Sequence, residues 1–119
     1  MKAILLVSHG SRSPKTKEEI VFLVNALRQR LPGVMIEFAF LEIENPNIPE
    51  GIDKCVAHGA KQIVVTLNFL NAGRHVDIDI PAIVKTARSK YPSLYITITK
   101  ALGQHAQIPN LFIDLINNA

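Results

Sequence analysis

The chain contains one cysteine, no tryptophan, two tyrosines and five phenylalanines. The single cysteine, Cys55, cannot form a disulfide within the chain, and the lack of a CxxC motif excludes a thiolate zinc site built from one chain. Cys55 falls in a helical pattern, which predicts a buried, inert thiol. The 13 basic residues are scattered and aromatic residues are sparse. The net charge of +3 therefore does not predict a nucleic-acid partner.

Long apolar runs and nucleotide-binding motifs are also missing. The N-terminal apolar run ends at Val7, too early for a secretion signal, and no run reaches the length of a membrane span. We therefore expect a cytoplasmic protein with no membrane partner. The chain has no GxGxxG, Walker A or GxSxG motif, which counts against dinucleotide binding, nucleoside-triphosphate binding and serine-hydrolase chemistry.

Apolar residues make up 48% of the 119 residues, enough to bury the core of a domain. No linker divides the chain, so residues 1–119 are expected to form a single domain. Apolar runs alternate with segments whose apolar residues recur every three or four positions, a pattern that predicts a doubly wound α/β sheet with parallel strands. The expected strands are residues 3–7, 34–41, 62–67 and 94–99, and the expected helices cover about 14–31, 49–58, 78–90 and 108–117.

A flavodoxin-like strand order, 2-1-3-4, with helices on both faces, is the arrangement we expect for this four-stranded sheet. In this order the first and third strands are neighbours, and the direction of the connections reverses between them. Ligands of such sheets bind at this switch point, beyond the carboxyl ends of the strands. His9 follows the first strand and His75 follows the third, so the topology predicts that both imidazoles line the ligand site.

Two histidines at one edge of the sheet predict a transition-metal site, since imidazole suits cobalt, nickel and iron. Each has a glycine nearby, Gly10 or Gly73, where the backbone can turn sharply. For His9, a hydrogen-bonded turn without further function is an equal alternative. Glu42, directly after the second strand, is a candidate third ligand or proton acceptor. A solvated loop carboxylate is the more ordinary role for this residue.

Other polar residues near this edge have less specific interpretations. Asp77 and Asp79 fall at the start of a helix, where carboxylates stabilise the helix dipole, and one of them can instead orient His75. Glu44 is expected to be a solvated loop carboxylate. His105 follows the fourth strand and has no assigned role beyond lining the pocket.

Arg12 and Arg74 lie close in sequence to the two histidines. The planar fork of a guanidinium group suits carboxylates or phosphates, so the two arginines predict an anionic ligand. Lys15 and Lys17 add positive charge at the same opening.

Several segments share a pattern with a known family. They are Ser8-His9-Gly10-Ser11-Arg12, Phe40-Leu41-Glu42, Phe69-Leu70-Asn71-Ala72-Gly73-Arg74-His75-Val76 with Asp79-Ile80-Pro81, and Leu102-Gly103. In order and spacing the chain resembles, over essentially its whole length, the short sirohydrochlorin chelatases among the class II tetrapyrrole chelatases, usually named cobaltochelatases. The glycine-x-histidine element with its Asp-Ile-Pro is the most specific part. One departure is Thr66-Leu67-Asn68, where relatives often have a proline before the Phe-Leu pair.

The resemblance implies a metal chelatase of the lyase class that inserts a divalent metal into sirohydrochlorin, a polycarboxylated tetrapyrrole, and releases two protons. It implies a role in cobalamin, sirohaem or related biosynthesis. Co²⁺, with Ni²⁺ or Fe²⁺ as alternatives, would be a substrate, so no tightly bound cofactor is expected. His9 and His75 would handle the metal, and Glu42 matches a recurring acidic position. We expect Arg12 and Arg74 to hold substrate carboxylates. Because short family members pair, a homodimer is also implied.

Two other functions stay open from the residues alone. A non-enzymatic carrier of metal or tetrapyrrole would keep both histidines but would not accelerate metal insertion. A phosphotransfer enzyme with His9 as nucleophile would need a second catalytic histidine and more arginines around the phosphate.

Overall fold

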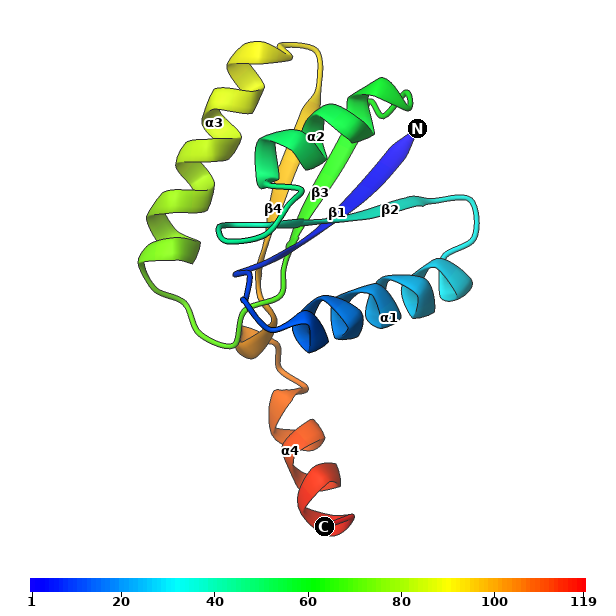
Figure 1. Cartoon of the computed structure of the whole chain (residues 1–119), viewed down its shortest axis with the longest axis vertical. Helices are drawn as coiled ribbons and strands as arrows, with labels where there is room; N and C mark the ends of the chain where they lie inside the picture. Colours follow the sequence, from blue (N-terminus) through cyan, green and yellow to red (C-terminus); the bar gives the residue numbers. More distant parts are fainter.

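The computed structural model describes residues 1–119 and contains a four-stranded parallel sheet with the order β2-β1-β3-β4 (Figure 1). This confirms the predicted flavodoxin-like order. None of the helices has the length and apolarity that crossing a membrane requires. The strands are β1 (Lys2–Ser8), β2 (Met35–Phe40), β3 (Gln62–Leu67) and β4 (Tyr95–Ala101), and the helices are α1 (Pro14–Arg30), α2 (Ile48–Ala57), α3 (Ile80–Lys90) and α4 (Ile108–Asn117).

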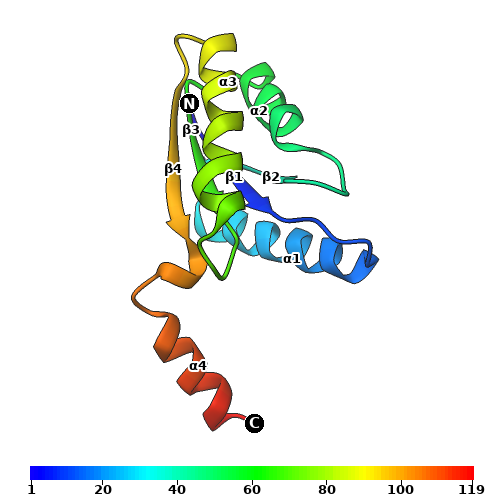
Figure 2. The same ribbon diagram turned by 90° about the vertical axis from the view of Figure 1, so that its left-hand side faces the viewer.

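Helices cover both faces of the sheet, as predicted. α2 and α3 lie together on one face (Figure 2), over the larger apolar cluster of the core. α1 packs on the other face over a smaller cluster. Cys55 belongs to the larger cluster, and burial raises the pKa of its thiol to about 11. The thiolate is therefore scarce at neutral pH, in line with the predicted inert role. The smaller cluster consists of Leu6, Ile20, Val24, Ile36 and Phe40.

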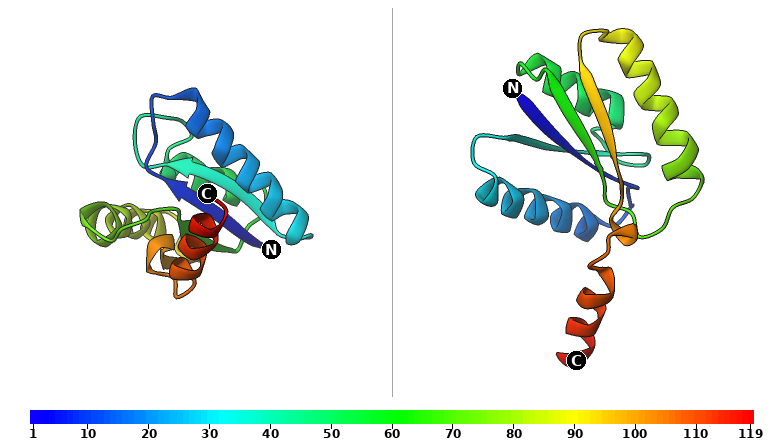
Figure 3. Two further views of the ribbon diagram at one scale, coloured as in Figure 1. Left: turned by 90° about the horizontal axis from the view of Figure 1, so that it is seen from below. Right: turned by 180° about the vertical axis from the view of Figure 1, so that it is seen from behind.

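α4 has the predicted bounds but does not pack on the sheet. It extends away from the other elements (Figure 1). On the face that carries α1, no helix lies over β3 and β4 (Figure 3, right), where Thr66 and Thr97 stay partly exposed. The chain thus has an apolar helix without a partner and a stretch of sheet without a cover. The large apolar residues of α4 that are more than half exposed are Leu111, Phe112, Ile113, Leu115 and Ile116.

The register of the sheet brings the ends of three strands to one level. Val7 of β1 pairs with Ala39 of β2 on one side and with Leu67 of β3 on the other. The loops that follow these strands therefore leave the sheet side by side, and the first and third of them lead to the two predicted histidines.

A polar contact ties α2 to the end of α3. The hydroxyl of Tyr91 donates a hydrogen bond to Oδ1 of Asp53 over 2.6 Å, and Nζ of Lys90 lies 3.1 Å from the same oxygen. The Tyr91 hydrogen bond, helped by Lys90, holds the pKa of Asp53 below its ordinary value. A carboxyl group with a lowered pKa stabilises the folded state above its unfolded pKa, and this contribution is lost as the pH falls through the folded pKa.

Tyr91→Phe should therefore destabilise the fold at pH 7, and this loss should shrink as the pH falls below about 4, where the carboxyl group of an unfolded aspartate gains its proton. Urea unfolding across this pH range measures the effect. Tyr95→Phe is the matched control, because Tyr95 is 62% exposed. An equal loss of stability for Tyr91→Phe at pH 7 and at pH 3 would contradict the proposed role of the Asp53 carboxylate.

Candidate metal centre

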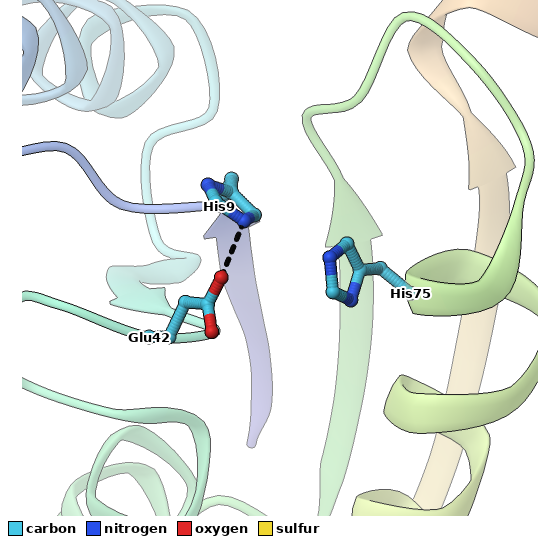
Figure 4. A group of neighbouring side chains, drawn as sticks. All are labelled: His9, Glu42 and His75. Atoms are coloured by element: carbon cyan, nitrogen blue, oxygen red, sulfur yellow. Dashed lines mark ion pairs between the residues drawn. The ribbon is translucent and has the colours of Figure 1, made fainter.

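The side chains of His9, Glu42 and His75 converge beyond the carboxyl ends of β1, β2 and β3 (Figure 4). One potential ligand atom of each residue lies within 4.8 Å of the others. Nε2 of His9 is 2.7 Å from Oε1 of Glu42. The centroids of the two imidazole rings are 5.2 Å apart, and the ring planes are inclined by 48°. The structure thus brings together the three residues predicted as metal ligands.

His9 is positioned by tight contact between the loops that follow β1 and β2. The amides of Leu41 and Glu42 donate hydrogen bonds to the carbonyls of Ser8 and His9, over 2.8 and 3.1 Å. Gly10 has a φ of +103°, and a Cβ atom there would stand 1.9 Å from the carbonyl oxygen of Glu42. Nδ1 of His9 lies 3.1 Å from the Gly10 carbonyl. Donation from Nδ1 to this carbonyl turns Nε2 toward Glu42, whose carboxylate oxygen can share a proton with it.

His75 lies on a helical turn that begins earlier than the sequence predicts. Residues His75–Asp79 form a π-helix directly before α3, whereas the apolar periodicity places the helix start near residue 78. The amide of Ile80 donates to the carbonyl of His75, five residues earlier, and closes this turn. Single π-helical turns are frequent at functional sites, and their wider spacing does not follow the apolar period of an α-helix.

This turn also decides between the two roles open to the aspartates. Oδ2 of Asp79 lies 2.8 Å from Nδ1 of His75, and Asp79 makes no side-chain capping bond to α3. The carboxylate therefore orients the imidazole, with the proton on Nδ1 and the lone pair of Nε2 free for a metal. Asp77 is exposed.

Asp79→Ala should weaken Co²⁺ binding by about 10-fold or more, since outer partners of histidine ligands typically contribute 10- to 100-fold to metal affinity. The variant loses the bond that fixes the tautomer and orientation of His75. A titration that follows the absorption bands of bound Co²⁺ measures the affinity. Asp77→Ala is the control on the same turn, and equal affinities of the two variants would contradict the role of Asp79.

The remaining predicted residues are placed differently. The prediction that Glu44 is simply solvated is wrong, because its Oε2 accepts the Ser11 amide over 2.9 Å. Arg12 lines an open cavity beside α1. Arg74 has a side chain that is 79% exposed, with Nε 3.9 Å from Asp79. His105 lies outside the group of three, and its Nδ1 accepts the amide of Gln107 over 3.0 Å.

Asn68 is a residue that the sequence marks only as part of a departure from the family pattern. Its side-chain amide donates to Oγ of Ser8 over 3.1 Å, and its backbone amide donates to the Val7 carbonyl over 2.9 Å. Ser8 directly precedes His9, and Asn68 opens the loop that leads to His75. Asn68 therefore joins the bases of the two histidine-bearing loops, a contact that no local sequence pattern signals.

The three candidate metal ligands are accessible from outside the protein and leave room for a bound ion to be exchanged. The side chains of His9, Glu42 and His75 are 46%, 52% and 45% exposed, so a ligand can reach all of them. Two imidazoles and one carboxylate suit borderline divalent ions of the cobalt, nickel and iron group. Three protein ligands leave coordination positions for another molecule, whereas a closed structural site uses four.

A flavodoxin-like sheet with two imidazoles and a carboxylate at its switch point defines an α/β protein with a candidate metal site. The model of the CbiX family matches residues 3–119. The chain therefore belongs to the CbiX family, which agrees with the resemblance seen in its motifs.

Named relatives agree with this assignment. The sirohydrochlorin cobaltochelatase of Priestia megaterium is 36% identical over 107 residues, which cover 90% of this chain and 35% of that protein. The chloroplastic sirohydrochlorin ferrochelatase of Arabidopsis thaliana is 32% identical over 115 residues, 97% of this chain and 49% of that protein. The crystal structure of SirB from Bacillus subtilis subspecies spizizenii in complex with cobalt matches with a TM-score of 0.89 and 31% identity, over 98% of this chain and 50% of that one. The chain spans about half or less of the length of these proteins.

Proposed function

We propose that this protein is a sirohydrochlorin chelatase, which inserts a divalent metal into the tetrapyrrole in cobalamin, sirohaem or related biosynthesis. The observation that carries the proposal is the convergence of His9, Glu42 and His75 at the open edge of the sheet. Relatives named as cobaltochelatases and ferrochelatases support the substrate. Cobalt is our first choice of metal, because the matched SirB structure is a cobalt complex and because imidazole ligands suit it. Nickel and iron fit the same ligands.

The geometry suits the two requirements of metal insertion. The ion must be held and then surrendered, which three exposed ligands permit and a closed site would prevent. Two pyrrole nitrogens must lose their protons as they bind the metal. The His9–Glu42 pair, 2.7 Å apart, can take up one released proton, because an imidazole nitrogen and a carboxylate oxygen both act as proton acceptors. The product is the metallated ring plus two protons, with no change in the oxidation state of the metal.

Anaerobic absorbance of sirohydrochlorin with Co²⁺, Ni²⁺ or Fe²⁺ tests the proposal. We expect the protein to accelerate insertion over the protein-free control and to rank the three metals. Stoichiometric metal or tetrapyrrole binding without acceleration would contradict the chelatase and identify a carrier.

We further propose that residues 1–119 form one domain that works in the cytoplasm as a homodimer. The exposed apolar face of α4 and the uncovered face of β3 and β4 support a second copy of the chain. The match to half of SirB supports it as well, since a second copy supplies the equivalent of the other half. The free Cys55 fits a reducing compartment.

Light scattering should give about twice the chain mass of 13.2 kDa for the unmodified protein. Leu115→Lys with Ile116→Lys should shift it toward the monomer, because two charges replace side chains that are 67% and 69% exposed within one chain. Lys85→Gln on α3 is the control for a surface change elsewhere. A monomeric unmodified protein, or a variant that stays dimeric, would contradict this role of α4.

A further inference from the structure

The two imidazoles of the candidate metal centre belong to separate loops, and few contacts fix the distance between them. His9 follows β1 and His75 follows β3, and their ring centroids are 5.2 Å apart (Figure 4). No hydrogen bond or ion pair joins the loop of His9, residues 9–13, to the segment of His75, residues 69–79. The spacing of the two candidate ligands therefore depends on what holds the bases of these loops together.

Each of the two loops is attached to a different part of the structure. On one side, backbone hydrogen bonds join the loop of His9 to the loop that follows β2. On the other side, the amide of Gly103, after β4, donates to the carbonyl of Phe69 over 3.0 Å. Phe69 and Val76 also pack against the larger apolar cluster. His9 is therefore held together with β2, whereas His75 is held together with β3 and the segment that follows β4.

Asn68 joins these two parts. Its Nδ2 donates to Oγ of Ser8 over 3.1 Å, and its backbone amide donates to the carbonyl of Val7 over 2.9 Å. Any residue except proline can make the backbone bond, so the side-chain bond is what an asparagine adds at this position. Because Ser8 directly precedes His9, this bond acts on the base of the His9 loop.

Ser8 is an unusual residue at this place in the core. Among the 23 buried residues it is the only one with a hydroxyl, amide or charged side chain. A buried hydroxyl destabilises the folded state unless it has a hydrogen-bond partner, and Asn68 supplies that partner. Packing alone does not account for a serine here, since alanine would fill most of the same space. A polar link to the neighbouring loop does.

We propose that Asn68 is a positioning residue of the metal centre, which acts through Ser8 to hold His9 at the distance from His75 at which both imidazoles bind one ion. Neither Asn68 nor Ser8 belongs to the three candidate ligands. Groups that orient metal ligands raise metal affinity without contacting the ion. The inference rests on the proposed function, because it concerns the ion that a chelatase would insert.

Co²⁺ titration of Asn68→Ala tests the proposal. The variant should bind Co²⁺ about 10-fold more weakly, and the absorption bands of the bound ion should change, since they follow its coordination geometry. Thr99→Val is the matched control. Oγ1 of Thr99 accepts the amide of Leu67, also over 3.1 Å, so this variant loses a bond between β3 and β4 instead of one between β3 and β1. The control should keep the affinity and the absorption bands of the unmodified protein.

The double variant Ser8→Ala with Asn68→Ala separates positioning from stability. Asn68→Ala alone leaves the buried hydroxyl of Ser8 without its partner, which lowers the urea concentration at which the protein unfolds. The double variant removes both polar groups, so it should unfold at a higher urea concentration than Asn68→Ala. Its Co²⁺ affinity should stay as low as that of Asn68→Ala, because the link between the loops is still missing. If Asn68 only stabilised the fold, affinity and stability would recover together.

Failure of this inference can be told apart from failure of the proposed function. If Asn68→Ala binds Co²⁺ with the affinity and absorption bands of Thr99→Val, or if the double variant regains affinity along with stability, the positioning role is overturned, whether or not the protein inserts metal. If Asn68→Ala shows the expected loss but the unmodified protein does not accelerate insertion, the positioning role stands and the chelatase fails. Absence of Co²⁺ binding by the unmodified protein would contradict both.

Discussion

His9→Ala and His75→Ala should each lower the rate of metal insertion into sirohydrochlorin by at least about 100-fold, the scale of losing a positioned proton acceptor or a metal ligand. The two histidines have different partners in the structure, which indicates different roles. His9 faces Glu42 across 2.7 Å and can pass a proton to it, whereas His75 is oriented by Asp79 and has Nε2 free. Loss of either leaves at most one imidazole and one carboxylate at the site, too few donors to hold the ion beside the ring.

Anaerobic absorbance measures the rates, and Co²⁺ titration measures the loss of affinity in the same variants. The double variant should be little worse than either single variant, because residues that act as one unit are not additive. His58→Ala is the matched control, since His58 is the C-cap of α2, outside the candidate metal centre, and its Nδ1 lies 2.8 Å from the Lys54 carbonyl. Insertion at the unmodified rate by either site variant would exclude that histidine from the mechanism.

Much of the fold follows from local pattern. The predicted bounds of β3 and α4 agree with the structure, and the other elements differ by a few residues at their ends. Apolar runs and helix-stopping residues are local signals, so the sequence can reveal them. The position of α4 is different. Its apolar face predicts a helix that packs on something, but the pattern cannot say whether the partner is its own sheet or another chain.

The candidate site, too, contains some features that the sequence predicts and others that it does not. His9, Glu42 and His75 are predictable because parallel strands deliver their following residues to one edge, whatever the details of the loops. The role of Asp79 depends on a π-helical turn that brings it to His75, and that of Glu44 depends on its contact with the Ser11 amide. The left-handed backbone of Ile43, with a φ of 73°, has no sequence signal, since isoleucine is among the residues least expected there.

Gly10→Ala should weaken Co²⁺ binding by about 10-fold or more, as does the loss of other groups that orient metal ligands. A methyl group at this position would stand 1.9 Å from the carbonyl oxygen of Glu42. The loops after β1 and β2 would have to separate, and with them His9 and Glu42. The backbone φ of +103° adds a second penalty, because alanine resists the left-handed region.

Gly33→Ala separates these two effects. Gly33 also has a positive φ, of 82°, but a Cβ atom there meets nothing within 4 Å. This control should lose stability, by about 1 kcal/mol for the left-handed backbone, and bind Co²⁺ as the unmodified protein does. Urea unfolding and Co²⁺ titration of both variants therefore distinguish backbone strain from displacement of the ligands. If Gly10→Ala loses stability but binds Co²⁺ normally, close contact between the loops is not what positions His9 and Glu42.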